Sequence, residues 1–513
     1  MLSIRTGMRT RSTKELFPDN RLNRFVVPLV LFLIGLLFLT HLPFLNADPD
    51  TMVSLNTRGA WTDEGLYTAQ LRDFINHGHL ELYNNNGFIV TPGFQLMLWP
   101  VFYLFGTDIV VGRLFTLLLT IAVLLLFASH SNLRLPALFY LLLTGFQYHF
   151  FQFCHYSMGE LSAINMLLLS LFSLVKYEES SSAGKKRQWL LMAVFFSFLS
   201  WTVKIQFAYV AVLVPASLLL KALINSSGTE GNRKQAFGHF GISVLFTIAF
   251  TLLYLLVWYL PHREFFNYIM SYETADRFKK SFSELSGVYR FNFRHLIWVK
   301  ELWPLIALSL LLLVAYIFSL VSGKNRKGLP VAMLFAVLWL LVEQHKIAMI
   351  YLPTRYFLSL IAAAGMVAAL SAAPLIQGRK LLTVLIFPLI AAVFIWNAMQ
   401  VYSTWQRRTF DIRAVKEYLG KSDIPKDQPV LGIWAYTLAA DSKVPTLGIR
   451  HNYLNDKDPI RTYKPRLVIT EFNQAESDSA WARQGIQLAA LSDSVRRFRV
   501  WRYDLDFYWI RQK

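Results

Sequence analysis

The sequence predicts an α-helical polytopic membrane protein with about eleven transmembrane helices, interfacial helices in its first outer loop and a small C-terminal α/β domain. The first observation is composition: 55% of the 513 residues are hydrophobic and 15% are aromatic, which argues against a soluble enzyme of this length. The second is that apolar runs of about 20 residues, the length that crosses the hydrocarbon, recur as far as residue 402. The third is a change to mixed polar sequence from residue 403 onward.

The formal net charge of +19 does not indicate a nucleic-acid partner, because Lys and Arg cluster in short segments between the apolar runs. That arrangement is a topology signal, since cytoplasmic loops of membrane proteins are enriched in both residues. Cys154, the only cysteine, excludes an intrachain disulfide and a cysteine metal cluster. The first apolar run is too long for a signal-peptide core and lacks a small-residue cleavage site, so we interpret it as a retained span.

Eleven apolar runs are the candidate spans. They are residues 25–45, 109–128, 134–152, 157–175, 189–203, 205–222, 239–260, 300–321, 330–343, 356–375 and 381–402. With a cytoplasmic N-terminus, every predicted cytoplasmic loop contains Lys or Arg, and the C-terminus lies outside. The pair within 189–222 has only about 17 residues per crossing, the lower limit for a span. Merging this pair would place the "TDEG" and "PTRY" segments on opposite sides of the membrane.

The first outer loop begins with the segment "GAWTDEGLYTAQLRDFINHG". Thr62 is a candidate N-cap, Asp63 and Glu64 lie in the first turn, and the apolar residues that follow share one face before Gly78. We expect an amphipathic helix at the outer membrane surface. A second short helix is predicted from Thr91 to the glycine of "YLFG". Carboxylates in a first turn are favoured by the helix dipole, so the acid pair is either a helix-start signal or a general base.

The chain is predicted to divide into a transmembrane domain, residues 1–402, and an extracytoplasmic α/β domain, residues 403–513. In the second part, "DIRAVKEYLGKS" has a helical pattern. The segments "QPVLGIW", "RLVITEF" and "RFRVWRYD" have strand patterns and are separated by polar connections.

Several segments, in their order and spacing, resemble the GT-C membrane glycosyltransferases. The similarity is to bacterial relatives of the protein O-mannosyltransferases and of the lipid A aminoarabinose transferase. It is carried by "DEGLYTAQLRDFINHG", "TPGFQLMLWPVFYLFGTDIVVGRLFTLLL", "HYSMGELSAINMLLLSLFSL", "SWTVKIQF" and "YLPTRYFLSLIAAAG". The family shows an Asp-Glu pair after the first span and an Arg at the start of the next, here Arg113. The resemblance covers about 400 residues and eleven spans, which is the family's usual topology.

The resemblance implies that the protein moves a sugar, with inversion at the anomeric carbon, from a polyprenyl-phosphate carrier to an acceptor. The acceptor hydroxyl belongs to a lipid, a glycan or a protein, and the reaction takes place at the outer face of the bacterial inner membrane. Asp63 aligns with the family's first acid and is predicted to be the base that takes the hydroxyl proton. Glu64 is predicted to orient the site or contact the acceptor.

The departing phosphate needs cations near the bilayer surface. Arg355 matches the Arg of the family's "RY" pattern and is the predicted phosphate clamp, since a guanidinium binds phosphate bidentately. Lys346 lies in the same loop, and Lys204 matches a family Lys between two apolar runs. The alternative for Arg355 and Lys346 is snorkelling at a span end, and Lys204 at a hairpin tip has the alternative of reaching water.

Four further residues are predicted to line the same cavity. They are Glu160, Arg58, His345 and Tyr356. Glu160 has the alternative role of a helix cap. The sequence predicts no His-bound metal, because the histidine pairs 77/79 and 149/155 have no common ligand spacing. The acid pair leaves a Mg²⁺ or Mn²⁺ site open, although the O-mannosyltransferase branch does without a metal.

Two alternatives from other classes remain at this stage. A transporter or flippase of a lipid-linked sugar would also need intramembrane charges facing a cavity, although the paired halves of many transporters are not evident here. A membrane anchor that displays the C-terminal domain would leave the acids and Lys204 without a function. The sequence has neither a GxGxxG nor a Walker-type phosphate loop, consistent with a lipid-linked donor rather than a nucleotide sugar.

Overall fold

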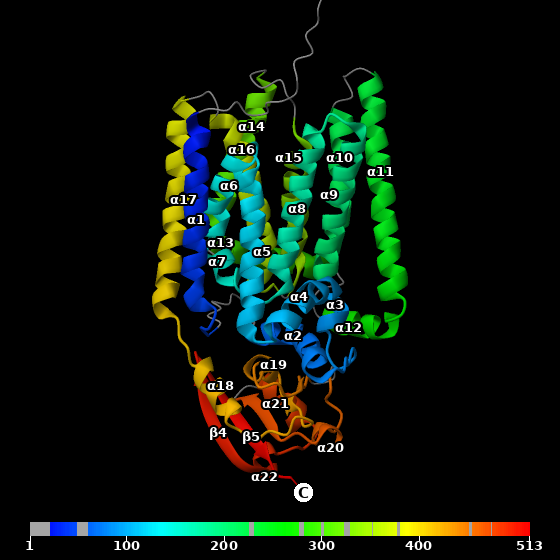
Figure 1. Ribbon diagram of the computed structural model, residues 1–513, viewed down its shortest axis with the longest axis vertical. Coiled ribbons are helices and arrows are strands. Elements are labelled where there is room, and N and C mark those ends of the chain that lie inside the picture. Colours follow the sequence, from blue (N-terminus) through cyan, green and yellow to red (C-terminus); the bar gives the residue numbers. More distant parts are fainter. Residues whose placement is uncertain are drawn as a thin grey trace, which may run out of the picture.

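A computed structural model describes residues 21–48, 60–224, 230–275, 282–298, 302–322, 329–350, 352–376, 380–450, 454–472 and 475–512. Figure 1 shows three tiers along the long axis of the molecule. A bundle of long helices forms the first tier, a layer of short helices lies at one end of it, and a small domain containing a sheet lies beyond that layer.

Among the described residues, eleven roughly parallel helices make up the bundle. They are α1 (Arg21–His41), α5 (Ile109–Ser129), α6 (Arg134–Tyr140), α8 (Gly159–Glu179), α9 (Ala183–Val203), α10 (Leu213–Ile224), α11 (Glu230–Tyr254), α14 (Trp303–Val321), α15 (Val331–Val342), α16 (Phe357–Ile376) and α17 (Lys380–Arg407). Short 3-10 or π segments extend or join them: η1 (Leu42–Phe44), η2 (Leu141–Gly145), η3 (Ile205–Val212), η5 (Leu255–Tyr259), η6 (Glu343–Ala348) and η7 (Thr354–Tyr356).

Nine helical segments of the described chain are long and apolar enough to cross a membrane, and α6 and α9 stand beside them in the bundle. These eleven follow the predicted spans in order, which confirms the predicted helical membrane fold. The short pair within 189–222 is two helices, because α9 ends at Val203 and η3 begins at Ile205 after an extended Lys204.

The predicted span 134–152 is not one continuous helix. Helix α6 passes into the π turn η2, and α7 (Tyr148–Phe153) begins after Gln147. The Gln147 side chain accepts a hydrogen bond of 2.9 Å from the backbone N–H of Phe150 and so caps the new helix. The residues on both sides of the break are buried, so the sequence continues as one largely apolar run across it.

Short helices lie at the end of the bundle that faces the small domain. They are α2 (Ala60–His77), α3 (Gly87–Val90), α4 (Pro92–Phe105) and α12 (Arg263–Ala275). A further helix, α13 (Phe282–Trp298), contacts η6 through Asn292, whose side-chain amide donates to the Ile347 carbonyl at 2.8 Å. The second predicted interfacial helix is confirmed as α4, which ends before Gly106 at φ +92°.

Helix α2 differs from its prediction in two respects. It already includes Ala60, so Thr62 lies inside the helix and is not its N-cap. Its apolar residues do not form one membrane-facing stripe: Leu71 joins the bundle core, whereas Leu66 packs against Tyr436 of the small domain. Both sides of α2 are buried because a segment some 370 residues later in the chain covers the second one.

The small domain has a five-stranded sheet of order β2-β1-β3-β5-β4, in which β1 is parallel to β2 and β3 and the other pairs are antiparallel. Its elements are α18 (Ile412–Gly420), β1 (Val430–Leu431), α19 (Ala435–Leu438), β2 (Thr446–Leu447), α20 (Pro459–Tyr463), β3 (Leu467–Glu471), α21 (Ala475–Ala482), α22 (Leu488–Leu491), β4 (Ser492–Val500) and β5 (Tyr503–Ile510). The predicted helix at 412–420 and the mixed α/β composition are confirmed. The predicted single strand "RFRVWRYD" is wrong, because the chain turns at Trp501, where φ is +53°.

Candidate active site

Asp63 lies on the first turn of α2, a helix that stands between the bundle and the small domain (Figure 1), and its side chain is only 11% exposed. One carboxylate oxygen, Oδ2, lies 2.7 Å from Nη2 of Arg355. Arg355 belongs to η7, the short turn between Pro353 and the start of α16. Residues almost 300 positions apart in the sequence therefore form a buried ion pair, as their predicted location on the same side of the membrane requires.

Glu160 and Lys204 complete this group of charges. Glu160 begins α8, and its Oε1 lies 3.1 Å from Nζ of Lys204 and 3.6 Å from Nε of Arg355. Lys204 lies at the chain reversal after α9, with its ammonium 3.7 Å from the ring centroid of Tyr67. We name Asp63, Glu160, Lys204 and Arg355 the Asp63 cluster; each of the four is less than 9% exposed.

The Asp63 cluster has two acids and two cations, so its formal charges cancel, which a buried group of charges requires. Its hydrogen bonding is nevertheless incomplete. Neither Nζ of Lys204 nor either carboxylate oxygen of Glu160 makes a hydrogen bond of good geometry within the described residues. Buried polar groups in this condition need a further partner such as water or a ligand.

Close backbone packing places Lys204 in the cluster. A Cβ atom on Gly93, in the first turn of α4, would lie 2.5 Å from Oγ1 of Thr202 and 2.8 Å from the backbone nitrogen of Val203. Only glycine permits α4 to approach the end of α9 this closely. The "TPG" segment of the first outer loop thus sets the position of the reversal that carries Lys204.

Glu64, the second acid of the pair, points into a different environment. Its oxygens accept from Nε and Nη2 of Arg113 at 2.9 and 2.8 Å, and from the backbone N–H of Ser157 at 3.0 Å. Nη1 of Arg113 also donates to the carbonyls of Phe44, Leu45 and Ala47 at 2.8 to 3.1 Å. Glu64 is fully buried, and through Arg113 its carboxylate connects α2 to α5 and to the residues that follow α1.

The next residue, Gly65, is held by the small domain. Its N–H donates to Oγ1 of Thr437 at 3.2 Å, and Nη2 of the buried Arg72 bridges the carbonyls of Tyr436 and Gly65 at 2.5 and 3.3 Å. A Cβ at Gly65 would lie 2.3 Å from the carbonyl carbon of Tyr436. Helix α19 therefore packs directly against the backbone of α2 at Gly65, two residues after Asp63.

Lys346 belongs to a separate buried group. Its Nζ lies 2.6 Å from Oε2 of Glu343 and donates to the carbonyl of Tyr356 at 3.0 Å. Glu343 also accepts from Ser359 at 2.6 Å and from the Tyr209 hydroxyl. Lys346 thus contacts the backbone of η7, the turn that carries Arg355. Among the described residues, no ion pair joins Lys346 to Asp63 or Glu160.

The other predicted cavity residues are placed as follows. Tyr356 is buried, and its ring centroid lies 5.4 Å from the Arg355 guanidinium carbon, so it adjoins the cluster. His345 is exposed, with Nδ1 2.6 Å from the Val342 carbonyl and its ring against Tyr209. Arg58 lies outside the described residues.

Tyr67 is a site residue that sequence reasoning missed. Burial, followed by the charges of Asp63 and Glu160, raises the pKa of Tyr67 well above its usual value, so its hydroxyl stays protonated. Tyr67 follows Asp63 by four positions, which places the two side chains on the same face of a helix. This i, i+4 spacing is the feature of the sequence that could have identified Tyr67 as a neighbour of Asp63.

The acid pair does not fit a divalent cation. Glu64 is paired with Arg113, Arg355 contacts the carboxylates of both Asp63 and Glu160, and Lys204 pairs with Glu160. Within the ranges that the structure describes, no three His, Cys, Asp or Glu side chains converge.

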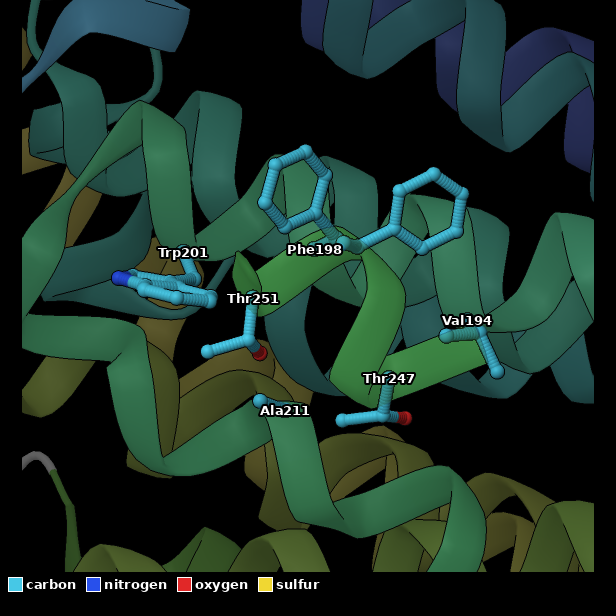
Figure 2. A pocket seen from close by; sticks show the side chains of 7 residues that line it. Val194, Phe198, Trp201, Ala211, Thr247 and Thr251 are labelled. Carbon is cyan, nitrogen blue, oxygen red and sulfur yellow. The ribbon is translucent and has the colours of Figure 1, made fainter. Parts of the chain in front are cut away.

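Figure 2 shows a recess elsewhere, between α9, η3 and α11, lined by Val194, Phe198, Trp201, Ala211, Thr247, Phe250 and Thr251. It encloses about 170 Å³ of empty space, its open mouth included. The recess contains no member of the Asp63 cluster, so it is not a candidate active site.

Solved structures share this architecture. ArnT from Cupriavidus metallidurans matches with a TM-score of 0.58 and 14% identity in its complex with undecaprenyl phosphate, covering 94% of this chain and 98% of that chain. Its apo state matches with 0.59 and 15% identity, covering 95% and 98%. An Archaeoglobus fulgidus oligosaccharyltransferase in complex with Zn and sulfate matches with 0.52 and 11% identity, covering 86% of this chain and 68% of that chain.

No protein-family model and no curated protein sequence matches the chain. At these identities the structural matches establish the architecture, and they extend from the transmembrane bundle through the C-terminal domain. The chain therefore shares the fold of the ArnT and oligosaccharyltransferase structures, which is the fold that its sequence motifs predict.

Proposed function

We propose that this protein transfers a sugar, with inversion, from a polyprenyl-phosphate-linked donor to an acceptor hydroxyl. The observation that carries the proposal is the Asp63 cluster, which brings a carboxylate and two cations together in a buried site at one end of a membrane bundle. The shared fold supports it, since the ArnT structure contains undecaprenyl phosphate.

In the proposed step, the acceptor oxygen attacks the anomeric carbon of the sugar while the bond from that carbon to the phosphate oxygen breaks. The acceptor proton passes to Asp63, and the electron pair of the broken bond leaves with the polyprenyl phosphate. A base is needed because an alcohol has a pKa far above 7 and attacks poorly while protonated. Arg355 and Lys204 stabilise the negative charge that develops on the leaving phosphate.

The ion pairs of the cluster suggest how the base becomes active. Arg355 already binds Asp63 at 2.7 Å, so an arriving phosphate competes with that carboxylate for the guanidinium. Phosphate binding then loosens the hold of Arg355 on Asp63, and the carboxylate gains freedom to accept a proton when the donor is in place. Lys204, whose ammonium lacks a well-formed hydrogen bond, is the second phosphate ligand.

We place the reaction at the outer face of the bacterial cytoplasmic membrane. The short basic segment at the start of α9, which includes Lys185 and Arg187, lies at the end of the bundle opposite to Lys204. The positive-inside rule favours a cytoplasmic location for that basic end. The Asp63 cluster and the domain formed by residues 403–513 then face the outside.

The test begins with mass spectrometry of lipids that co-purify with the protein, because the donor headgroup names the sugar. Purified protein in detergent is then given that polyprenyl-phosphate sugar and an acceptor, and release of polyprenyl phosphate is measured. Asp63→Asn is expected to lower turnover by about 10²- to 10⁴-fold with little change in donor affinity. Arg355→Ala is expected to weaken donor binding, with Arg355→Lys intermediate because it keeps the charge and loses the bidentate geometry.

Retained turnover in Asp63→Asn would refute the base assignment, and unchanged donor affinity in Arg355→Ala would refute the phosphate clamp. The same assay separates the enzyme from a transporter or flippase of a lipid-linked sugar. A transporter would bind the donor and leave its sugar–phosphate bond intact.

A further inference from the structure

Five arginines gather where α17 leaves the bundle and the small domain begins. We name Arg407, Arg408, Arg413, Arg499 and Arg502 the arginine surface; four are exposed, and Arg408 is half-buried. The first three flank the connection from α17 to α18, and the other two flank the β4–β5 turn. The two segments are joined directly, because the Trp501 N–H donates to Oδ2 of Asp411 at 3.0 Å.

Aromatic rings hold three of the five guanidinium groups of this surface in place. Arg408 lies 3.9 Å from the ring centroid of Trp405, Arg413 lies 4.3 Å from that of Phe410, and Arg502 lies 4.4 Å from that of Trp501.

No carboxylate within the described ranges forms an ion pair with any of the five arginines. Other arginines of the same domain do have such partners, for example Arg497 with Asp506 and Arg511 with Asp493. The surface therefore presents positive charge that is not paired with any carboxylate of the described residues.

The position of the arginine surface along α17 matches the headgroup layer of a bilayer. The exposed side of α17 is apolar or aromatic at Trp396, Met399 and Tyr402, which are 41%, 63% and 59% exposed. Arg407 follows Tyr402 by five residues, or about 7.5 Å of helix. The headgroup region on each side of the hydrocarbon is about 5 to 8 Å thick. The helix thus passes from hydrocarbon through an aromatic belt into arginine, as at a membrane surface.

We propose that the arginine surface binds the phosphate headgroups of anionic phospholipids and so seats the small domain on the bilayer. Arginine is suited to this role because its guanidinium binds phosphate bidentately while stacking on an aromatic ring. Continuity with the lipid-facing side of α17 favours the bilayer over a soluble partner. On the orientation proposed above, these arginines lie on the side where short loops usually contain few basic residues, so the topology signal does not explain their presence.

The test uses the full-length protein in mixed micelles of detergent with equal amounts of phosphatidylglycerol and phosphatidylcholine. Native mass spectrometry counts the lipids of each kind that remain bound. The variant Arg408→Gln/Arg413→Gln/Arg502→Gln is expected to lose binding of phosphatidylglycerol by about fivefold per arginine, on the order of 100-fold in all, with phosphatidylcholine unaffected. The control is Arg461→Gln/Arg483→Gln/Arg511→Gln, which removes the same charge away from this surface and is expected to behave as wild type.

A second measurement does not depend on a folded variant. Hydrogen–deuterium exchange of the wild-type protein in nanodiscs is expected to show slower exchange at residues 403–413 and 498–503 with phosphatidylglycerol than with phosphatidylcholine alone. Equal exchange in the two lipids would overturn the proposal. So would equal loss of phosphatidylglycerol in the two triple variants, because the effect would then reflect net charge rather than this surface.

Discussion

Replacing each of the adjacent acids Asp63 and Glu64 by its amide is predicted to have different effects, on turnover for Asp63 and on stability for Glu64. Glu64→Gln removes the negative partner of Arg113, whose side chain is 1% exposed and keeps its charge. Breaking a buried pair in this way typically costs about 3 to 5 kcal/mol, because the remaining charge is left uncompensated. Asp63→Asn costs less, since Arg355 retains Glu160 at 3.6 Å, and its main effect is on turnover.

The assay compares the two variants by thermal denaturation in detergent, followed by size-exclusion chromatography, and by sugar release below the melting temperature. We expect Glu64→Gln to melt several degrees lower than wild type, and Asp63→Asn to melt close to wild type while losing turnover. Adding Arg113→Met to Glu64→Gln is expected to restore only part of the stability, because three carbonyls lose their donor as well. Wild-type stability of Glu64→Gln would refute the structural role of the pair.

Three further predictions concern α2 and its neighbours. Burial raises the pKa of the Asp73 carboxyl to about 7, above its value in the unfolded chain. The folded state therefore loses stability as the pH rises from about 4 to 7, by at most about 1.4 kcal/mol per pH unit. Asp73→Asn should raise the melting temperature at pH 8 and not at pH 4, because the amide cannot ionise. Gly65→Ala should lower both turnover and melting temperature, because its Cβ meets the backbone of α19. Gly184→Ala in α9 should lower neither, because its Cβ would make only an ordinary contact at 3.8 Å with Oγ of Ser182. Glu160→Gln should tighten binding of undecaprenyl phosphate by removing an anion that competes for Lys204, as measured by thermophoresis, and equal or weaker binding would contradict that competition.

Much of the fold follows from patterns that are local in the sequence. Each span is set by the length of its apolar run, and the reversal at Lys204 follows from a charge between two such runs. Counting spans also places Asp63 and Arg355 on the same side of the membrane. The sequence could therefore predict that these two residues share one end of the bundle, where the structure pairs them. Two loops lie on the same side of the membrane when an even number of spans separates them, and counting spans needs no knowledge of packing.

Which acid of the pair meets which arginine did not follow from the sequence. Both Arg113 and Arg355 are predicted at the ends of spans on the same side, and nothing local assigns one to Asp63 and the other to Glu64. Lys346 illustrates the same difficulty, since its sequence position near Arg355 suggested a phosphate ligand, whereas its nearest acid is Glu343, three residues before it. The covering of α2 by α19 depends on a contact between residues 372 positions apart, which periodicity in α2 cannot reveal.

Three consecutive residues of α2 are held by three different parts of the molecule. Asp63 contacts Arg355 before α16, Glu64 binds Arg113 of α5, and Gly65 binds Thr437 of α19. Successive residues of a helix point about 100° apart, so these contacts surround the helix rather than crowd one side of it. Because Glu64 and Gly65 fix the helix against the bundle and the small domain, the position of Asp63 depends on contacts made by both. The small domain thus supports the proposed base through the backbone of α2, although it contributes no side chain to the Asp63 cluster.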